Sequence, residues 1–398
     1  MTDSSSPAAA FEPEWKRLWL INPGITFLNH GSFGACPIAV LEKQQELRHL
    51  LESEPLRFME DQLESLLDAA REALANFVGA FPSELVFVPN ATTGINTVLR
   101  SLSFQPGDEL LTTNQEYNAS RNALNFVAAQ SGATVIVAEI PFPIASPNQV
   151  IDAVMAKISA RTRLVLIDQV TSQTALILPI EALVQRLKPF GIEVLVDAAH
   201  APGMIPLNLR ELGVAYYTGN CHKWMCAPKG AAFLYVRQDQ QSRIRPLVIS
   251  HGANSPRLDR SRFHLEFDWM GTTDPTSYLC VSKAIDWMAA LLPGGWAELM
   301  TRNQEMALAA RAMLCDALNV APPSPDCMIG SMAGVPLPPG SAKGLQMQLF
   351  DRFQIEVPII PWQGVTDRLL RVSAQLYNSL PDYDYLSKAL LVLLAEGA

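Results

Sequence analysis

Six short apolar segments rich in Val, Ile and Leu recur along residues 84–236, and amphipathic stretches separate them. The segments are ELVFVPN, DELLTT, ATVIVAEI, TRLVLIDQV, GIEVLVDAAH and GAAFLYV. Strands that stay apolar along most of their length are typical of parallel sheets that are buried on both faces. The amphipathic stretches between them supply helices to cover those faces. This alternation predicts an α/β fold built on a mostly parallel sheet.

A helical pattern precedes these segments. Between about residues 40 and 78, apolar side chains such as Leu63, Leu67 and Leu74 recur at three- and four-residue steps, which is the spacing of one helix face. We therefore predict helix over this stretch. Met1 to Ala10 is small and polar, and we expect it to be a frayed tail.

The end of the chain predicts a separate, smaller unit. A turn cluster at Pro293–Gly295 precedes a helix to about residue 318, and residues 321–340 hold six of the 29 prolines. A helix around residues 345–352, two short strands and a closing helix are expected after it. The expected organisation is an N-terminal arm (1–27), a large domain (28–294) and a small α+β domain (295–398).

Composition excludes several classes of protein. The formal net charge is −9 without a long basic block, which disfavours binding to nucleic acid or to an anionic membrane. No apolar stretch approaches the roughly 18 residues of a membrane span, and the first twenty residues lack the pattern of a signal peptide. The six cysteines form no CxxC pair, as is usual for reduced thiols. We expect a cytoplasmic enzyme.

An acidic residue stands where one of the buried strands ends. Asp197 closes the strand in GIEVLVDAAH, and His200 follows three residues later. Ligands of open α/β sheets bind beyond the carboxyl ends of the strands, so an acid there is well placed for chemistry. The alternative is that Asp197 only caps the next helix.

One lysine lies in a stretch with few other charges. Lys223 stands between His222 and Trp224 in TGNCHKWMCAPKG, and a lysine in such surroundings can have a lowered pKa and act as an amine nucleophile or Schiff-base former. A surface lysine is the alternative. A metal site formed by Cys221, His222 and Cys226 matches no usual zinc spacing, and we expect no metal.

The segment NATTG at residues 90–94 has the features of an anion site. It joins a strand to a helix, and Thr92 and Thr93 supply hydroxyl groups beside the free N–H groups of the first helical turn. Ordinary helix capping by either threonine would explain the same residues. Motifs for dinucleotides, nucleoside triphosphates, serine hydrolases and zinc proteases are absent from the sequence.

Together these segments carry a resemblance to a known family. The order of a strand, NATTG and a helix, then VDAAH, then HK, then a late RVSAQLYN resembles the class V aminotransferases. LNHGSFGACP, DQVTSQTALILPI and MGTTDPTSYL are most similar to the isopenicillin N epimerase-like branch. The resemblance implies fold type I of the pyridoxal phosphate-dependent enzymes, with a mostly parallel, seven-stranded-type sheet in the large domain and a smaller C-terminal α+β domain.

The resemblance also implies a set of cofactor-binding residues for pyridoxal 5′-phosphate. Lys223 would form the Schiff base with the cofactor and shuttle the substrate α-proton, and Asp197 would pair with the pyridine nitrogen so that the ring can accept carbanion charge. His200 would hydrogen-bond the ring hydroxyl, and Tyr117 would stack on the ring. The resemblance further implies that Ser172 lies near the ring. The residues implied around the phosphate are Thr92, Thr93, His222 and Thr218.

Substrate binding and assembly follow from the same resemblance. Arg371 would grip the substrate α-carboxylate with its planar fork, unless it forms a surface ion pair. Asn29, His30 and Ser32 would line the entrance, although a tight glycine-rich turn explains them equally well. Thr272 would reach the phosphate of a neighbouring subunit, which implies a homodimer.

The implied activity is epimerisation of an amino acid through α-proton removal. Inversion needs a second acid or base besides Lys223, and Tyr117, His30 and a water molecule are candidates. A C–S lyase, a transaminase and a non-catalytic binding protein on the same fold are the alternatives. The stretch EVPIIPWQGVTDRLLR has no cysteine, so it departs from the cysteine desulfurases, which carry a reactive cysteine there.

Overall fold

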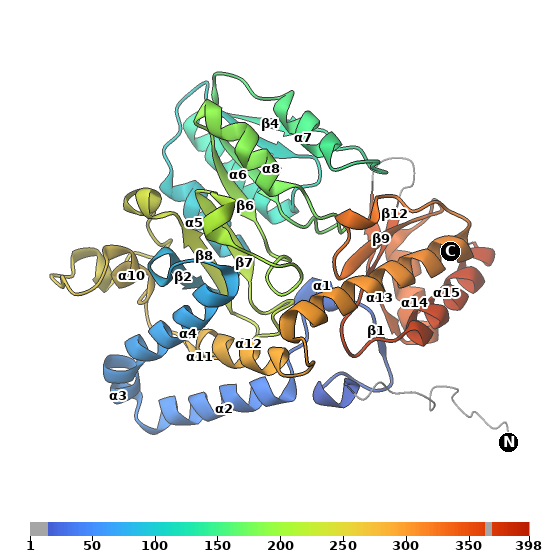
Figure 1. Cartoon of the computed structure of the whole chain (residues 1–398), viewed down its shortest axis with the longest axis horizontal. Helices are drawn as coiled ribbons and strands as arrows, with labels where there is room; N and C mark the ends of the chain where they lie inside the picture. Colours follow the sequence, from blue (N-terminus) through green and yellow to red (C-terminus); the bar gives the residue numbers. More distant parts are fainter. Residues whose placement is uncertain (1–14, 363–367, 398) are drawn as a thin grey trace.

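A seven-stranded sheet forms the centre of the computed structural model, which describes residues 15–362 and 368–397 (Figure 1). In spatial order its strands are β2 (Leu85–Val88), β8 (Ala232–Val236), β7 (Tyr216–Asn220), β6 (Glu193–Asp197), β5 (Thr162–Asp168), β3 (Glu109–Thr113) and β4 (Thr134–Ala138). β8 runs antiparallel to both of its neighbours, and the other neighbours pair in parallel. The predicted mostly parallel sheet is therefore confirmed.

All six apolar segments form strands of this sheet, and one strand escaped the sequence pattern. β7 has the sequence YYTGN, in which Thr, Gly and Asn replace the expected apolar residues. It is nevertheless fully buried because it lies between β6 and β8 in the middle of the sheet. Tyr and Thr favour strands, but the segment lacks the run of Val, Ile and Leu that marked the other strands, and its burial follows from its central position in the sheet.

Helices cover both faces of the sheet, as expected from the alternation of side chains along each strand. In β6, Val194 and Val196 pack on one face, while Leu195 packs on the other. The first face is covered by α2 (Ile38–Ser53), α4 (Leu63–Val78), α7 (Asn148–Met155), α8 (Ile180–Leu187) and α12 (Val281–Ala289). The second is covered by α5 (Ala91–Ser101), α6 (Asn118–Ser131) and α10 (Arg262–Phe267).

The predicted helical stretch from residue 40 to residue 78 is interrupted. α2 ends at Ser53, and α3 (Pro55–Arg57) and a π-helical turn (Phe58–Gln62) precede α4. Proline has no N–H to donate and disfavours helical geometry in the residue before it, and Glu54 indeed has a non-helical backbone. Pro55 thus divides the stretch into helices that run in different directions (Figure 1).

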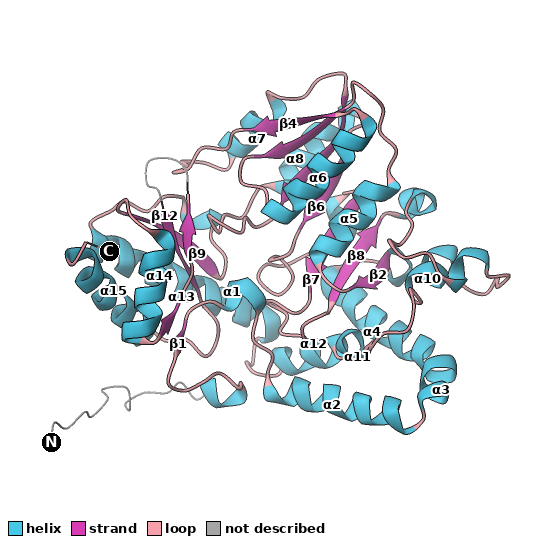
Figure 2. Ribbon diagram, turned by 180° about the vertical axis from the view of Figure 1, so that it is seen from behind, coloured by secondary structure: helices cyan, strands magenta, loops and turns pink. Residues whose placement is uncertain are grey.

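The C-terminal part contains a smaller sheet of three antiparallel strands, ordered β11 (Ile359–Pro361), β12 (Arg368–Ser373) and β9 (Met332–Leu337). β9 lies in the proline-rich stretch that did not predict a strand. β10 (Ile355–Glu356) pairs with β1 (Thr26–Phe27). The helices that pack here are α13 (Gly295–Leu318), α14 (Ala342–Phe353) and α15 (Leu380–Ala395) (Figure 2).

The N-terminal segment joins the two parts. Leu28 packs in the core of the smaller sheet, and α1 (His30–Phe33) lies between the two sheets in both views (Figures 1 and 2). The domain limits at residues 27/28 and 294/295 stay predictions, and the tail at residues 1–10 lies outside the described residues. Among the helices of the described part of the chain, none has the length and apolar character of a membrane span.

Candidate active site

Several of the predicted site residues lie at the carboxyl ends of the central strands. Asp197 is the last residue of β6 and lies in register with Asp168 of β5 and Thr218 of β7. The turn that carries Lys223 follows β7 directly, and α5 begins after β2. Parallel strands bring their carboxyl ends to one edge, where open α/β sheets bind ligands.

Lys223 and His200 are hydrogen-bonding neighbours. The Nζ atom of Lys223 lies 3.2 Å from Nε2 of His200. Burial, reinforced by the positive charge of Arg371, lowers the pKa of Lys223 to about 7. Burial and the charge of Lys223 also hold the pKa of His200 well below its usual range. Near neutral pH the lysine amine is therefore available in its uncharged, nucleophilic form, beside a neutral imidazole.

Asp197 is held in place by two donors. The Oγ–H of Ser120 donates to its Oδ2 at 2.6 Å, and the backbone N–H of Ala199 donates to its Oδ1 at 3.1 Å. Burial raises the pKa of Asp197, and these two hydrogen bonds act against that rise. The sequence analysis missed Ser120, although its place one helical turn after Tyr117 was a usable signal.

The start of α5 fits an anion site, but Thr218, one of the residues predicted to bind the phosphate, does not reach it. Asn90, not a threonine, caps the helix by accepting the N–H of Thr93 at 2.8 Å. Thr92 and Thr93 are partly exposed there. Thr218, in contrast, is fully buried, and its hydroxyl donates to the carbonyl of Phe233 at 2.8 Å. The structure therefore does not bring Thr218 to the open site.

Two further cofactor candidates are accessible. His222 is partly exposed, and its Nδ1 lies 3.0 Å from the carbonyl oxygen of Ala231, which fixes the ring orientation. Tyr117 precedes α6 and is 42% exposed. A stacking position for Tyr117 and a phosphate contact for His222 stay predictions.

Arg371 occupies the site without a carboxylate partner. It lies on β12 and is 3% exposed. Its guanidinium donates to the carbonyl of Ser172 at 2.5 Å, to Oγ of Ser172 at 3.3 Å and to Oγ of Ser32 at 2.8 Å. Burial lowers its pKa to about 10. Within residues 15–362 and 368–397 it forms no ion pair, so the alternative of a surface ion pair is wrong.

Ser32 and Asn29 extend this arrangement. Ser32 accepts from Arg371 and donates to Oδ1 of Asn29 at 2.5 Å. These two residues thus hold one side of the guanidinium fork. Ser172 also contacts Arg371, and its place near the cofactor ring stays a prediction.

His30 does not line the entrance, contrary to the prediction. It is fully buried, with Nε2 3.0 Å from the carbonyl oxygen of Lys223 and Nδ1 2.7 Å from the hydroxyl of Tyr377. Nδ1 also accepts the N–H of Ala35, so the Tyr377 hydroxyl and the Nε2–H are the donors. His30 therefore fixes the backbone behind the lysine.

Thr272 is exposed in the loop between α10 and α11 (Thr276–Leu279). Its contribution to a neighbouring subunit stays a prediction. Cys221 and Cys226 are both fully buried, and within the described ranges the only cluster with metal-ligand spacing contains neither of them.

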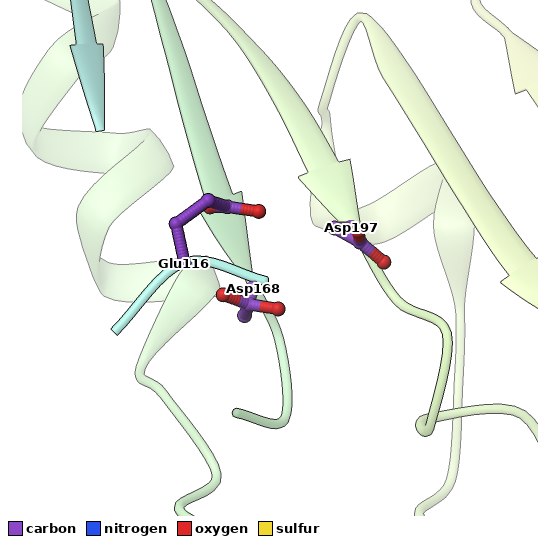
Figure 3. Close-up of side chains that lie close together, drawn as sticks. All are labelled: Glu116, Asp168 and Asp197. Carbon is purple, nitrogen blue, oxygen red and sulfur yellow. The ribbon is translucent and has the colours of Figure 1, made fainter. Parts of the chain in front are cut away.

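That cluster consists of Glu116, Asp168 and Asp197 (Figure 3). The sequence analysis missed the first two residues. A signal existed for Asp168, because the segments LVLID and EVLVD both end in Asp, and parallel neighbours ending alike place the two carboxylates side by side. Glu116 gave no comparable signal, because it lies in the loop before α6.

The sheet order, the smaller C-terminal domain and the partly buried Lys223 at the carboxyl ends of the strands, hydrogen-bonded to His200, define the class as fold type I pyridoxal phosphate-dependent enzymes. The family model described as aminotransferase class-V matches residues 35–355. The chain therefore belongs to the class V aminotransferase family, whose cofactor is pyridoxal phosphate, as the sequence predicted.

The similar proteins carry out more than one reaction. Isopenicillin N epimerase of Amycolatopsis lactamdurans is 35% identical, over 93% of this chain and 95% of that protein. A putative L-cysteine desulfhydrase of Oryza sativa subsp. japonica is 30% identical, over 94% of this chain and 84% of that protein. The cystine C–S lyase C-DES, solved with its product cysteine persulfide, shares the fold with a TM-score of 0.79 at 21% identity. The match covers 92% of this chain and 97% of that chain.

The residues present fit pyridoxal phosphate. Nδ1 of His200 and Nε of Arg371 are buried without a hydrogen-bond partner in the described structure, as expected for groups that await a ligand. A side chain at Gly34 would place its Cβ 2.1 Å from the carbonyl oxygen of His222 and 2.9 Å from Cα of Lys223. The lysine turn is therefore packed closely against the N-terminal segment.

Cofactor uptake by the apoprotein should depend on pH through Lys223. Only the uncharged amine attacks an aldehyde, so below the pKa of about 7 the rate should fall about tenfold per pH unit, and above it the rate should level off. The pKa of His222 is lowered to about 4, so this imidazole stays neutral across the range. Stopped-flow absorbance between about pH 5 and 9 measures the rate. A midpoint near the ordinary lysine pKa would contradict the low value.

Proposed function

We propose that this chain is an amino-acid epimerase similar to the isopenicillin N epimerases. The observation that carries the proposal is that one site holds Lys223, hydrogen-bonded to His200 and with a lowered pKa, and a buried Arg371 whose Nε has no hydrogen-bond partner among the described residues. A base and a carboxylate-binding fork in one site suit removal of the α-proton from an amino acid. The identity to the epimerases of Amycolatopsis lactamdurans and, at 32%, of Streptomyces clavuligerus supports this choice.

Each residue has a defined task in this proposal. The cofactor, when bound, supplies an electron sink for the negative charge that develops at the α-carbon. Asp197 holds the ring nitrogen protonated, and neutral His200 hydrogen-bonds the ring hydroxyl. Thr92 and Thr93, with His222, bind the phosphate at the start of α5. Tyr117 stacks on the ring.

Arg371 fixes the α-carboxylate of the substrate, and Ser32, Asn29 and Ser172 hold the guanidinium. Lys223 then takes the α-proton on its own face of the substrate. His30 contributes by hydrogen-bonding the carbonyl of Lys223, which orients the lysine turn.

Inversion requires a second proton donor on the opposite face. Both ring nitrogens of His30 are engaged in hydrogen bonds and the side chain is buried, so His30 is unsuited to this task. Tyr117 is 42% exposed and lies close enough to Arg371 to act on its pKa. We assign the second proton transfer to Tyr117, directly or through a water molecule.

A C–S lyase acting on a cysteine-type substrate is the second candidate. It is favoured by the four L-cysteine desulfhydrases or putative desulfhydrases of Oryza sativa and Arabidopsis thaliana at 29–30% identity. The stretch from Glu356 to Arg371 has no cysteine, so such a lyase would not work through a persulfide on that loop.

The reaction is tested with the cofactor-loaded enzyme in heavy water, with isopenicillin N and L-cysteine as substrates. Epimerisation predicts deuterium at the α-carbon together with inverted stereochemistry. Tyr117→Phe should lower inversion by about 10²-fold while exchange with retention continues through Lys223. Tyr385→Phe is the matched control, because Tyr385 has a similar exposure of 43% but lies on α15.

Other results assign other reactions. Pyruvate and ammonia from cysteine would identify the lyase, and amino transfer to an added keto acid would identify a transaminase. Exchange with complete retention in the unmodified enzyme would refute epimerisation. No bound chromophore after addition of the cofactor would favour a binding protein without catalysis.

We further propose that the enzyme acts as a cytoplasmic homodimer. Thr272 is exposed on a loop, which leaves its side chain accessible to the phosphate site of a second subunit.

A further inference from the structure

Three carboxyl groups meet behind the predicted position of the cofactor ring. Glu116 comes from the loop before α6, Asp168 from the end of β5 and Asp197 from the end of β6 (Figure 3). One oxygen of each lies within 4.8 Å of the others. The three residues are 5%, 3% and 2% exposed, respectively.

The three groups differ in the hydrogen bonds that they receive. Both oxygens of Asp197 accept hydrogen bonds, from Ser120 and from the N–H of Ala199. Oε2 of Glu116 accepts from the hydroxyl of Thr112 at 3.2 Å, and the backbone N–H of Tyr117 also acts on this carboxyl group. Oε1 of Glu116 and Oδ2 of Asp168 are buried and receive no hydrogen bond in the described structure.

Within the described part of the chain, no positively charged side chain forms an ion pair with the cluster. Arg121 is the cation that acts on Glu116, and its guanidinium donates instead to the carbonyl of Thr113. Lys223 acts on both aspartates at longer range. The backbone amide of Tyr117 is the remaining polar group that acts on Glu116 and Asp168.

We propose that Glu116 and Asp168 are protonated, neutral acids at neutral pH, and that the cluster carries one negative charge, held by Asp197. Three like charges within 4.8 Å cannot all remain ionised in a buried site without cations in contact. The charge settles on Asp197, because both of its oxygens accept hydrogen bonds, whereas Glu116 and Asp168 each keep one buried oxygen without a donor in the described structure. Burial, and next the neighbouring carboxylates, raise the pKa of both Glu116 and Asp168 well above the usual range.

Protonation of Glu116 and Asp168 determines where the negative charge near the cofactor lies. Two neutral acids behind Asp197 leave a single fixed charge at the ring nitrogen. Glu116 and Asp168 are thus positioning residues that act through Asp197. This consequence rests on the proposed function, whereas the protonation of the two acids does not.

Infrared spectroscopy of the cofactor-loaded enzyme tests the proposal directly. A neutral carboxyl group gives a C=O stretch that is separate from carboxylate bands and shifts in heavy water. We expect this band in the unmodified enzyme between about pH 6 and 8, where ordinary carboxyls are ionised. The double variant Glu116→Gln and Asp168→Asn should lose it.

Glu109→Gln is the matched control. Glu109 is as buried as Glu116, but Arg161 and the hydroxyl of Ser159 contact its carboxylate, and these contacts lower its pKa. It is therefore ionised already, and its replacement should leave the band unchanged.

A second readout follows the bound cofactor. Because Gln and Asn imitate the neutral acids, the visible spectrum at neutral pH should be the same in the double variant and in the unmodified enzyme. A spectral transition on alkaline titration, caused by ionisation of the cluster, should be lost in the variant. The two single variants, and the band of the unmodified enzyme, keep the test decisive if the double variant does not fold.

Three results would overturn the proposal. They are absence of the band in the unmodified enzyme, persistence of the full band in the double variant, and one equivalent of a tightly bound metal ion that the double variant lacks. The last result would mean that a cation, rather than protons, neutralises the cluster. None of these results depends on whether the enzyme epimerises its substrate. Failure of the proposed reaction can therefore be distinguished from failure of the proposed protonation state.

Discussion

Replacing Lys223 by Ala should remove the covalent attachment of the cofactor and lower turnover by about 10³-fold or more. The variant loses the amine whose pKa is lowered to about 7, and with it both the attachment point and the base for the α-proton. The visible spectrum, and the protein mass after borohydride treatment, measure the attachment. The unmodified enzyme should gain the reduced cofactor in mass, and the variant should not.

Lys229→Ala is the control for this substitution. Lys229 lies in the same turn region, but its Nζ donates to the carbonyl of Gly34, away from the imidazole of His200. Its replacement should leave the covalent attachment intact. If the Lys223 variant still retained the borohydride-fixed cofactor, another lysine would have to be the attachment point, and the assignment would fail.

Replacing Arg371 by Ala should lower kcat/KM by about 10²- to 10⁴-fold, mainly through KM. Hydrogen bonds to charged groups contribute about 1.5–3 kcal/mol each, and a bidentate fork makes two of them. Initial rates over a range of amino acid concentrations separate the two parameters. If kcat fell and KM did not change, Arg371 would not be binding the α-carboxylate of the substrate before the reaction.

Arg371→Lys provides a graded comparison. It keeps the positive charge but loses the planar fork, and it cannot reproduce the contacts to both Ser32 and Ser172. We expect it to bind substrate more weakly than the unmodified enzyme and more tightly than the Ala variant. Equal affinity of the Lys and Ala variants would show that charge makes no contribution at this position.

The fold could largely be predicted from local patterns. Each apolar segment is long enough to form a strand by its own composition, and the prediction of a mostly parallel sheet is confirmed. β7 was missed because its sequence YYTGN lacks the run of Val, Ile and Leu by which the other strands were predicted, although Tyr and Thr favour strands. Its central place in the sheet depends on its neighbours. The break at Pro55 shows that helical periodicity continues through a residue that ends a helix.

The site was harder to predict from the sequence than the fold. Asp197 and His200 were found because they follow the end of a predicted strand, and Lys223 was found because its stretch has few other charges. The roles of all three stay predictions. His30 was assigned to the entrance through the family resemblance, but it hydrogen-bonds the backbone carbonyl of Lys223 instead. Thr218 was assigned to the phosphate, although it is covered by the first turn of α5, where Gly94 leaves room for it.

The sequence by itself determined the fold class, because the apolar periodicity is local. The family and the cofactor followed from the resemblance of its short motifs to the class V aminotransferases. The tertiary structure alone decided which distant side chains meet. Arg371 reaches Ser32 across 339 residues of sequence, and Glu116, Asp168 and Asp197 become one cluster only because β5 and β6 are neighbours. Such contacts depend on the order of the strands and the packing between domains, which no local stretch of sequence specifies.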